Sequence, residues 1–367
     1  MLIQLVDLVV QYKSIQPEIE EAIQRVLTSG HFILGSEVAN LEEEICAYLK
    51  VKHGIGVGSG TDALVLALRA LEIGPGDEII VPAYTFFATA GAVLLVGARP
   101  VFTEIDPRTY CLDVEDAGRR ISERTKAIIP VHLFGHPAEM NSVLELAKRH
   151  NLKVIEDNAQ AFGATYYGSR TGSLGDIGCL SFFPTKNLGA YGDGGMVVTH
   201  DDGFAERVRA LRTHGWKKKY FPEMLGYNSR LDALQAAMLR AKLPHIDTWN
   251  EERRALAQRY SRRLADLGVG VPYEAEAACH VYHLYVVRLR ERDQVQNLLK
   301  EAGIAAEVYY PQPVHLTAPC QHLGYKPGDF PEAERASRET LAIPLYPEMT
   351  TTQIELVITA LENAVAQ

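Results

Sequence analysis

Short apolar runs alternate with helical patterns between residue 52 and about residue 200. Four of these runs are rich in β-branched residues and bounded by Gly, Pro or charge, which predicts buried strands at Glu78–Pro82, Pro100–Ile105, Ala127–His132 and Lys153–Glu156. The segments between them have helical spacing at Thr61–Leu71, Phe86–Val96 and Met140–His150. Strand–helix–strand alternation predicts an α/β fold with a mostly parallel sheet between helices. Ligands of such sheets collect at the carboxyl ends of the strands.

The pattern changes in the last third of the chain. Residues 229–267 form a long helical stretch, which Pro244 is expected to break in two. A smaller α+β unit is predicted after it. It begins with a strand at Val281–Leu289, a helix at Asp293–Ala302 and a strand at Ile304–Tyr310. A loop rich in Pro and His and two more helices complete it. We therefore expect a large domain over residues 1–245 and a small C-terminal domain over residues 246–367.

The composition of the chain excludes several classes of ligand, metal site and cellular location. The formal net charge is −9, which argues against a nucleic-acid-binding surface but not against a small anionic ligand. The five cysteines are scattered without a C-x-x-C pair, so a disulfide framework or a zinc site is not expected and a reducing compartment fits. We see no signal peptide and no apolar run of about 18 residues, so we expect a cytoplasmic protein without a membrane span.

A lysine follows one predicted strand at the edge where ligands gather. The strand Cys179–Phe183 is followed by Lys186 and then by four glycines within nine residues, in the segment Ser181–Gly195 (SFFPTKNLGAYGDGG). A lone lysine is usually a solvated surface charge. A desolvated lysine instead has a lowered pKa and becomes an amine nucleophile, for which a Schiff base with an aldehyde cofactor is the obvious use.

Asp157 ends the strand of Lys153–Glu156 on the same sheet edge. Taken alone, an Asp at this point is more often a helix N-cap. Near Lys186, the alternative is a buried carboxylate that keeps a pyridine nitrogen protonated and makes the ring an electron sink. Gln160, one turn further on, could reach the phenolic oxygen of the same ring, or could be an ordinary polar residue at a helix start.

Two further segments are compatible with a flat, phosphorylated cofactor. Gly56–Leu64 (GVGSGTDAL) is a glycine-rich turn that opens an apolar helix, so its free N–H groups and the Thr61 hydroxyl suit an anion, although a structural turn is about as probable. It lacks the third glycine of the dinucleotide motif, because Thr61 stands there. Pro82–Thr89 places aromatic rings after a strand, where they would stack on a cofactor or belong to the core.

Together these segments resemble the fold type I pyridoxal-phosphate aminotransferases, and more closely the DegT/DnrJ/EryC1/StrS sugar aminotransferases. The likeness covers nearly the whole chain. It includes the S-G-T-D-A-L turn, the E-D-N-A-Q-A segment, the lysine loop, and three more motifs at Gly30–Gly35, Pro130–Gly135 and Gly226–Asp232. The resemblance implies a large domain with a mostly parallel seven-stranded sheet between helices.

The resemblance also implies roles for individual residues. Lys186 would carry pyridoxal 5'-phosphate in a Schiff base and move the proton between cofactor and substrate carbon, Asp157 would pair with the pyridinium nitrogen, and Gln160 would contact the cofactor hydroxyl. The cofactor phosphate would be held by Gly60, Thr61 and Ser181, and Phe86 would stack on the cofactor ring. Asn228 would reach the phosphate of the cofactor in the neighbouring subunit, so a homodimer is implied. Members with histidine at the lysine position are dehydratases, and Lys186 excludes that branch.

The implied reaction takes the amino group of L-glutamate and gives it to a keto sugar of a nucleoside diphosphate. The segments His280–Arg288, Tyr309–His315 and Gly324–Pro331 resemble enzymes that act at C3 of dTDP-3-keto-6-deoxyhexoses, although enzymes for UDP-linked 3-keto and 4-keto sugars share much of this. Candidate substrate residues are Tyr310 and His315 in the Pro-rich loop, and Tyr220 in the basic cluster Trp216–Tyr220, which could meet a pyrophosphate or be a solvated loop.

His280 and His283 are expected to lie on opposite faces of a strand, because three residues separate them, and therefore to be packing residues rather than a metal pair. No metal site is expected.

Three rival functions remain. A nicotinamide-dependent oxidoreductase would need the missing third glycine. A non-catalytic, cofactor-binding homologue would not need Lys186, Asp157 and Gln160 intact. A hydrolase would need a glycine at Thr171 to complete G-x-S-x-G before Gly175.

Overall fold

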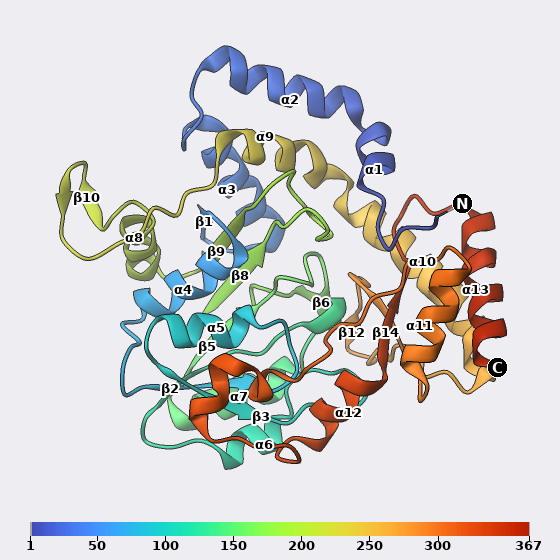
Figure 1. Ribbon diagram of the computed structural model, residues 1–367. Helices are drawn as coiled ribbons and strands as arrows, with labels where there is room; N and C mark the ends of the chain where they lie inside the picture. The colour runs from blue at the N-terminus through green and yellow to red at the C-terminus, as the bar shows by residue number, and fades with distance from the viewer. Residues whose placement is uncertain (1, 367) are drawn as a thin grey trace.

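The computed structural model describes residues 2–366 and is built around one seven-stranded sheet (Figure 1). The strand order is β1-β9-β8-β5-β4-β2-β3. All neighbours are parallel except β9, which runs antiparallel to both β1 and β8. The strands are β1 (His53–Val57), β2 (Glu78–Pro82), β3 (Arg99–Thr103), β4 (Thr125–Ile128), β5 (Lys153–Asp157), β8 (Ile177–Ser181) and β9 (Gly195–Thr199). The mostly parallel seven-stranded α/β sheet that was predicted is therefore confirmed.

Helices cover both faces of the sheet because its strands are apolar on both sides. In β2, Ile79 and Val81 join one buried cluster and Ile80 joins another, as the alternation of side chains along a strand requires. The helices of this part are α1 (Leu8–Ser14), α2 (Gln16–Ser29), α3 (Ser36–Leu49), α4 (Gly60–Ala70), α5 (Ala88–Leu95), α6 (Val114–Arg119), α7 (Met140–His150), α8 (Asp202–Leu211) and α9 (Ala233–Lys242).

The last third of the chain has its own apolar core. It is built on the two-stranded sheet of β13 (Tyr285–Arg288) and β14 (Thr340–Ile343), and it includes Ile3 from the start of the chain. The helices α10 (Ile246–Leu264), α11 (Arg292–Glu301) and α13 (Thr351–Val365) contribute to this core, whereas the apolar residues of α12 (Pro331–Glu339) join the core of the large sheet. Pro244 lies in the short turn between α9 and α10, so the predicted helix break is confirmed. The domain boundary near residue 245 stays a prediction.

Short strands complete the fold. β6 (Thr165–Tyr166), β7 (Ser169–Arg170) and β12 (Ala278–Cys279) form one small sheet. β10 (Trp216–Lys218) and β11 (Phe221–Pro222) form a hairpin, which projects from the body at the left of Figure 1. Among residues 2–366, no helix combines the length and the apolar character that crossing a membrane requires.

Two predicted strands of the C-terminal part were wrong in extent. The strand expected at Val281–Leu289 begins only at Tyr285, and the strand expected at Ile304–Tyr310 is a loop in which Ile304 and Glu307 make isolated bridges. Ile304 pairs with Ile3 and Glu307 pairs with Ala342. The apolar residues of these segments are buried by contacts with distant parts of the chain, which local periodicity does not distinguish from a strand.

Candidate active site

A cavity of about 670 Å³ opens at the carboxyl ends of β5 and β8. Its lining combines the start of α4, the turn after β5, the lysine loop after β8 and segments from both ends of the chain. Among the predicted site residues, Gly60, Thr61, Phe86, Asp157, Gln160, Ser181, Lys186 and Tyr310 all line it. The structure therefore gathers predicted residues from Gly60 to Tyr310 around one space.

The start of α4 forms an anion seat. Ser59 caps the helix, its hydroxyl accepting a hydrogen bond from the Asp62 N–H at 3.1 Å. The N–H groups of Gly60 and Thr61 begin the helix and so have no partner within it. A Cβ atom at Gly60 would lie 2.6 Å from the Cβ of Ser181, so only glycine lets the helix start approach this strand end. This narrow cradle of N–H and hydroxyl groups fits a phosphate.

Asp157 is buried at the end of β5. Its Oδ2 accepts a hydrogen bond from the Thr89 hydroxyl at 2.8 Å, and its Oδ1 accepts one from the Ala159 N–H at 3.2 Å. Burial raises the pKa of Asp157, and the bonds from Thr89 and Ala159 and the charge of Lys186 oppose that rise. A turn rather than a helix follows the strand, so Asp157 caps no helix. A buried carboxylate in a cavity wall fits the protonated nitrogen of a pyridine ring.

A second buried carboxylate fixes the end of the same strand and was not singled out from the sequence. Glu156 is fully buried, and His132 donates to it from Nε2 at 2.9 Å, since Nδ1 of that ring accepts the Ala138 N–H. Three backbone N–H groups also donate to Glu156: those of Gly172, Leu174 and Gly175. These bonds anchor β5 directly before Asp157.

Lys186 projects into the cavity from the loop after β8. Burial lowers the pKa of its amine to about 8, and the carboxylate of Asp157 opposes that shift. A larger fraction of the amine is therefore neutral near pH 8 than in an exposed lysine. A partly neutral amine facing a cavity of this size fits the aldehyde of a cofactor.

The side chain of His283 lies beside that amine. Its Nε2 lies 3.5 Å from Lys186 Nζ. The predicted placement of His280 and His283 on opposite faces of a strand was wrong, because β13 begins only at Tyr285. His283 lay inside the predicted strand Val281–Leu289, and the assumed strand geometry hid its position beside the lysine.

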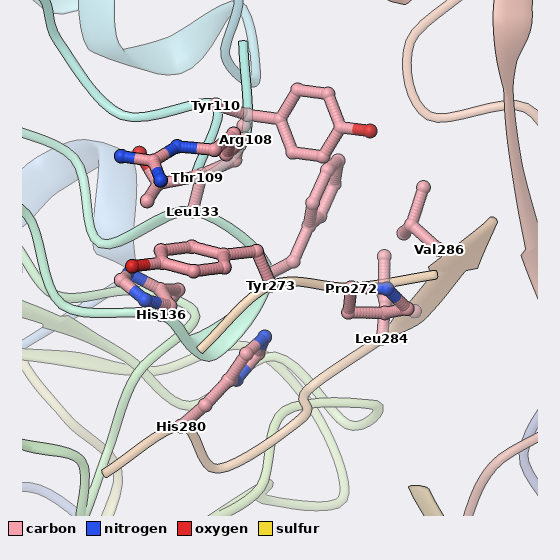
Figure 2. Close-up of a pocket in the computed structure, with 11 residues that line it drawn as sticks. Arg108, Thr109, Tyr110, Leu133, His136, Pro272, Tyr273, His280, Leu284 and Val286 are labelled. Carbon is pink, nitrogen blue, oxygen red and sulfur yellow. The ribbon is translucent and has the colours of Figure 1, made fainter. Parts of the chain in front are cut away.

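His280 is a packing residue, as predicted. The His280 ring stacks on the Tyr282 ring with centroids 3.9 Å apart. His280, His136 and Tyr273 also line a second cavity (Figure 2). That cavity measures about 10 Å³, the space of one water molecule at most. Among residues 2–366, no group of three or more His, Cys, Asp or Glu side chains is arranged to hold a metal ion.

Gln160 and two aromatic residues form another part of the cavity wall. Gln160 accepts a hydrogen bond from the Phe134 N–H and donates one to the Tyr310 hydroxyl, both at 2.8 Å. The ring of Phe86, which is 55% exposed, lies 6.0 Å from the ring of Tyr310. A flat ring bound in the cavity would therefore meet aromatic surface.

Three other predicted residues lie away from this cavity. His315 is enclosed by aromatic side chains, with Phe330 at a centroid distance of 4.7 Å, and it does not line this cavity. Its position in a Pro-rich loop gave no sign that the loop folds into an aromatic core. Tyr220 is 71% exposed on the β10–β11 hairpin, and Asn228 is exposed beside Ser229, whose hydroxyl bonds to Asp62. Neither residue lines the cavity of its own chain.

The sheet topology and this site define a fold type I pyridoxal-phosphate-dependent transferase. Comparison with known proteins agrees. The structure superimposes on that of DesV from S. venezuelae in complex with a ketimine intermediate, with a TM-score of 0.98, 44% sequence identity, and coverage of 100% of this chain and 99% of that chain.

Three relatives in sequence are similar over nearly their whole length. A pleiotropic regulatory protein of Geobacillus stearothermophilus is 51% identical, with 96% of each chain covered. The UDP-N-acetyl-3-dehydro-alpha-D-glucosamine 3-aminotransferase of Acidithiobacillus ferrooxidans is 46% identical, with 98% of this chain and 97% of the relative covered. The dTDP-3-amino-3,4,6-trideoxy-alpha-D-glucose transaminase of Streptomyces venezuelae is 45% identical, with 97% and 94% covered.

The chain belongs to the DegT/DnrJ/EryC1/StrS aminotransferase family, whose model matches residues 13–362. It is a pyridoxal-phosphate-dependent aminotransferase of nucleotide-linked sugars. The bound cofactor supplies an aldehyde that reacts with amines and a ring that withdraws electrons from the substrate carbon. The anion seat, the buried carboxylate and the amine described above fit its phosphate, its ring nitrogen and its aldehyde.

Proposed function

We propose that this enzyme transfers the amino group of L-glutamate to C3 of a dTDP-linked 3-keto-6-deoxyhexose. UDP-linked 3-keto or 4-keto sugars are the alternative acceptors. The choice of sugar rests on the side chains that line the cavity beyond the residues assigned to the cofactor. Leu5, Val6, Tyr309 and Tyr310 supply apolar and aromatic surface, and Glu307 supplies a carboxylate.

This wall favours a sugar that is uncharged and partly apolar. A methyl group at C6 gains from contact with the apolar side chains, whereas a carboxylate at C6 would be repelled by Glu307. The two relatives named for amino sugars without a carboxylate are 46% and 45% identical to this chain, whereas the relative named for a UDP-linked glucuronate is 40% identical.

We assign the residues of the cavity to the reaction as follows. Lys186 holds the cofactor covalently and, when its amine is free, moves a proton to and from the substrate carbon. Asp157 keeps the ring nitrogen protonated, and Gln160 contacts the ring hydroxyl. The phosphate is held by Gly60, Thr61 and Ser181, and the ring face is covered by Phe86.

A second copy of the chain would balance the charge of the ligands in this cavity. Lys186 is the only cation among the described residues that line it, and three carboxylates share the lining. A nucleoside diphosphate sugar and the cofactor phosphate bring several negative charges. Phe86 and Phe183 at the cavity are also 55% and 51% exposed, as an uncovered interface would be. We therefore propose a homodimer.

In this dimer, the basic hairpin of one subunit meets the diphosphate bound by the other. Lys217, Lys218 and Lys219 precede Tyr220 on the projecting hairpin, and Asn228 follows it in the chain. We propose that Tyr220 and the lysines contact the diphosphate and that Asn228 reaches the cofactor phosphate of the neighbour.

The five free cysteines support a cytoplasmic, reducing location.

A mixed-dimer experiment tests the sharing of sites. Lys186→Ala and a variant with Lys217, Lys218 and Lys219 changed to Ser should each be nearly inactive. When the two variants are refolded or co-expressed together, one of the two sites in each mixed dimer contains Lys186 and an intact hairpin, so activity returns. Absence of recovery, with mixed dimers detected by mass spectrometry, would show that the hairpin does not serve the neighbouring site.

A substrate panel tests the reaction itself. The purified enzyme is supplied with pyridoxal phosphate, L-glutamate and one keto sugar at a time: dTDP-3-keto-6-deoxyglucose, dTDP-4-keto-6-deoxyglucose or UDP-3-keto-N-acetylglucosamine. The products are identified by mass spectrometry and NMR. We expect the highest kcat/KM for the dTDP-linked 3-keto sugar, and a higher value for either of the others would reassign the substrate.

A regulatory role is the second candidate, because one relative is named as a pleiotropic regulatory protein. A non-catalytic homologue would bind the cofactor and transfer no amino group. Tight cofactor binding without conversion of any sugar, and without release of 2-oxoglutarate from glutamate, would favour that role.

A further inference from the structure

The segment that contains His283 is held by backbone contacts against Leu133–Gly135, a short turn that follows β4. Val281 N–H donates to Gly135 O at 3.1 Å, and Leu284 N–H donates to Phe134 O at 3.3 Å. Gly135 has a φ of +102°, and a Cβ atom there would lie 2.9 Å from the backbone nitrogen of His283. Glycine therefore permits this close approach, and the segment has little freedom to move away.

The lysine loop meets the same segment at two successive residues. Asn187 donates from Nδ2 to Val281 O at 3.2 Å and to Asn250 Oδ1 at 2.7 Å. The preceding residue, Lys186, places Nζ 3.5 Å from His283 Nε2, at the limit of hydrogen-bond distance. These contacts hold the lysine loop and the His283 segment together, so the Lys186 amine lies beside His283 Nε2.

The surroundings keep the His283 ring neutral. The ring is buried, which lowers the pKa of His283 well below its usual value. The charged and titratable groups that act on it are Lys186, Arg253 and His280, and each of them also disfavours the imidazolium. His283 is therefore suited to accept a hydrogen bond and unsuited to carry a charge.

We propose that His283 is a positioning residue for Lys186, accepting a hydrogen bond at Nε2 from the lysine amine whenever that amine is not bonded to the cofactor. An ammonium ion has no lone pair, so Nε2 must be the acceptor and Nδ1 keeps the ring hydrogen. Nδ1 has no hydrogen-bond partner among the described residues, so packing and Nε2 alone set the ring orientation. His283 gains and loses no proton in this role.

The hydrogen bond matters at the moment of proton transfer. The free amine of Lys186 has to lie at one place to take a proton from the substrate carbon and return it, and misplacement by about 1 Å costs up to about 100-fold in rate. The inference rests on the aminotransferase chemistry of the family and is independent of which sugar is used.

Two amide substitutions separate the hydrogen bond from packing. Gln places its side-chain oxygen near the position of the histidine Nε2, whereas Asn is one bond shorter and cannot reach it. Both are polar and of similar size. His280→Asn is the matched control, because it alters another buried histidine of the same segment that faces away from Lys186.

The first measurement is the pKa of Lys186 in the full-length protein freed of cofactor, from the pH dependence of its labelling by acetic anhydride as read by peptide mass spectrometry. Losing an acceptor destabilises the ammonium form. We expect His283→Asn to lower the pKa of Lys186 by about one unit, and His283→Gln and His280→Asn to leave it nearly unchanged.

The second measurement is the glutamate half-reaction of the loaded enzyme. We expect His283→Asn to lower kcat about 10-fold with little change in KM, and His283→Gln to restore most of the rate. The proposal would be overturned if the pKa of Lys186 did not change in His283→Asn. It would also be overturned if His283→Gln or His280→Asn shifted that pKa as much as His283→Asn does. Failure to convert any sugar would leave these readouts intact and would count only against the proposed substrate.

Discussion

Gln160 donates a hydrogen bond from Nε2 to the Tyr310 hydroxyl at 2.8 Å. This bond joins the turn after β5 to a loop 150 residues later in the chain. It links a residue proposed to contact the cofactor with one proposed to contact the sugar. The wall of the cavity is thus held together by polar bonds between distant segments, and these bonds can be removed one at a time.

Tyr310→Phe should destabilise the protein and disturb the cavity wall. It leaves the Gln160 amide unpaired in a buried place, which costs about 1–3 kcal/mol of unfolding free energy. Urea unfolding of the cofactor-loaded protein measures this. Tyr309→Phe is the control, because no hydrogen bond involves its hydroxyl among the described residues. Equal effects of the two variants would contradict a special role for the Gln160–Tyr310 bond.

Asp157→Asn should preserve the fold and slow the glutamate half-reaction by about 100-fold or more, the scale of lost charge stabilisation in an active site. A neutral amide does not hold a pyridine nitrogen protonated. Single-turnover formation of 2-oxoglutarate measures the rate. Thr89→Val, which removes only the hydroxyl that donates to Asp157, should have a much smaller effect. A near-native rate in Asp157→Asn would mean that ring protonation does not depend on this carboxylate.

Gly60→Ala should weaken cofactor binding, because the added Cβ would lie 2.6 Å from Ser181 Cβ and force the helix start away from the strand end. Overpacking of this kind costs about 1–3 kcal/mol, so the Kd for pyridoxal phosphate should rise about 5- to 150-fold. Equilibrium dialysis measures it. Gly203→Ala is the control, since its Cβ would meet only the Asp201 side chain at 3.5 Å. Unchanged affinity in Gly60→Ala would argue against the anion seat.

Covalent attachment of the cofactor should become faster as the pH rises. Burial lowers the pKa of Lys186 from 10.5 to about 8, so the amine is mostly a non-nucleophilic ammonium below pH 8 and mostly neutral above it. The rate of reconstitution from cofactor-free protein, followed by the visible absorbance of the product, should therefore rise with pH and level off above about 8. A rate that continues to rise toward pH 10 would indicate an ordinary, solvated lysine.

Much of the large sheet and its ligand edge could be predicted from the sequence. Strands such as Glu78–Pro82 are short, apolar and buried on both faces, and the residues that follow β5 and β8 line the cavity because parallel strands end at one edge. The resemblance to a known family then placed Gly60, Thr61, Phe86, Gln160 and Ser181 on the same cavity.

The placements that the sequence did not predict depend on contacts between distant segments. His283 lies at the lysine because Gly135 lets its segment dock there, and His315 is enclosed because Phe102 and Phe330 fold over it. Neither contact leaves a periodic pattern in its own segment. The segment Val281–Leu284 also looks like a strand in sequence, since it is apolar and flanks a true strand, but the backbone at Tyr282 has a φ of +45° and the chain bends at His283 and Leu284.

The most direct test of the account is borohydride reduction of the freshly purified protein, followed by peptide mass spectrometry. Reduction fixes a cofactor that is bonded to a lysine. We expect one tagged peptide, the one that contains Lys186, and no tag in Lys186→Ala. A tag on another lysine, or no tag even after added pyridoxal phosphate, would contradict the central claim.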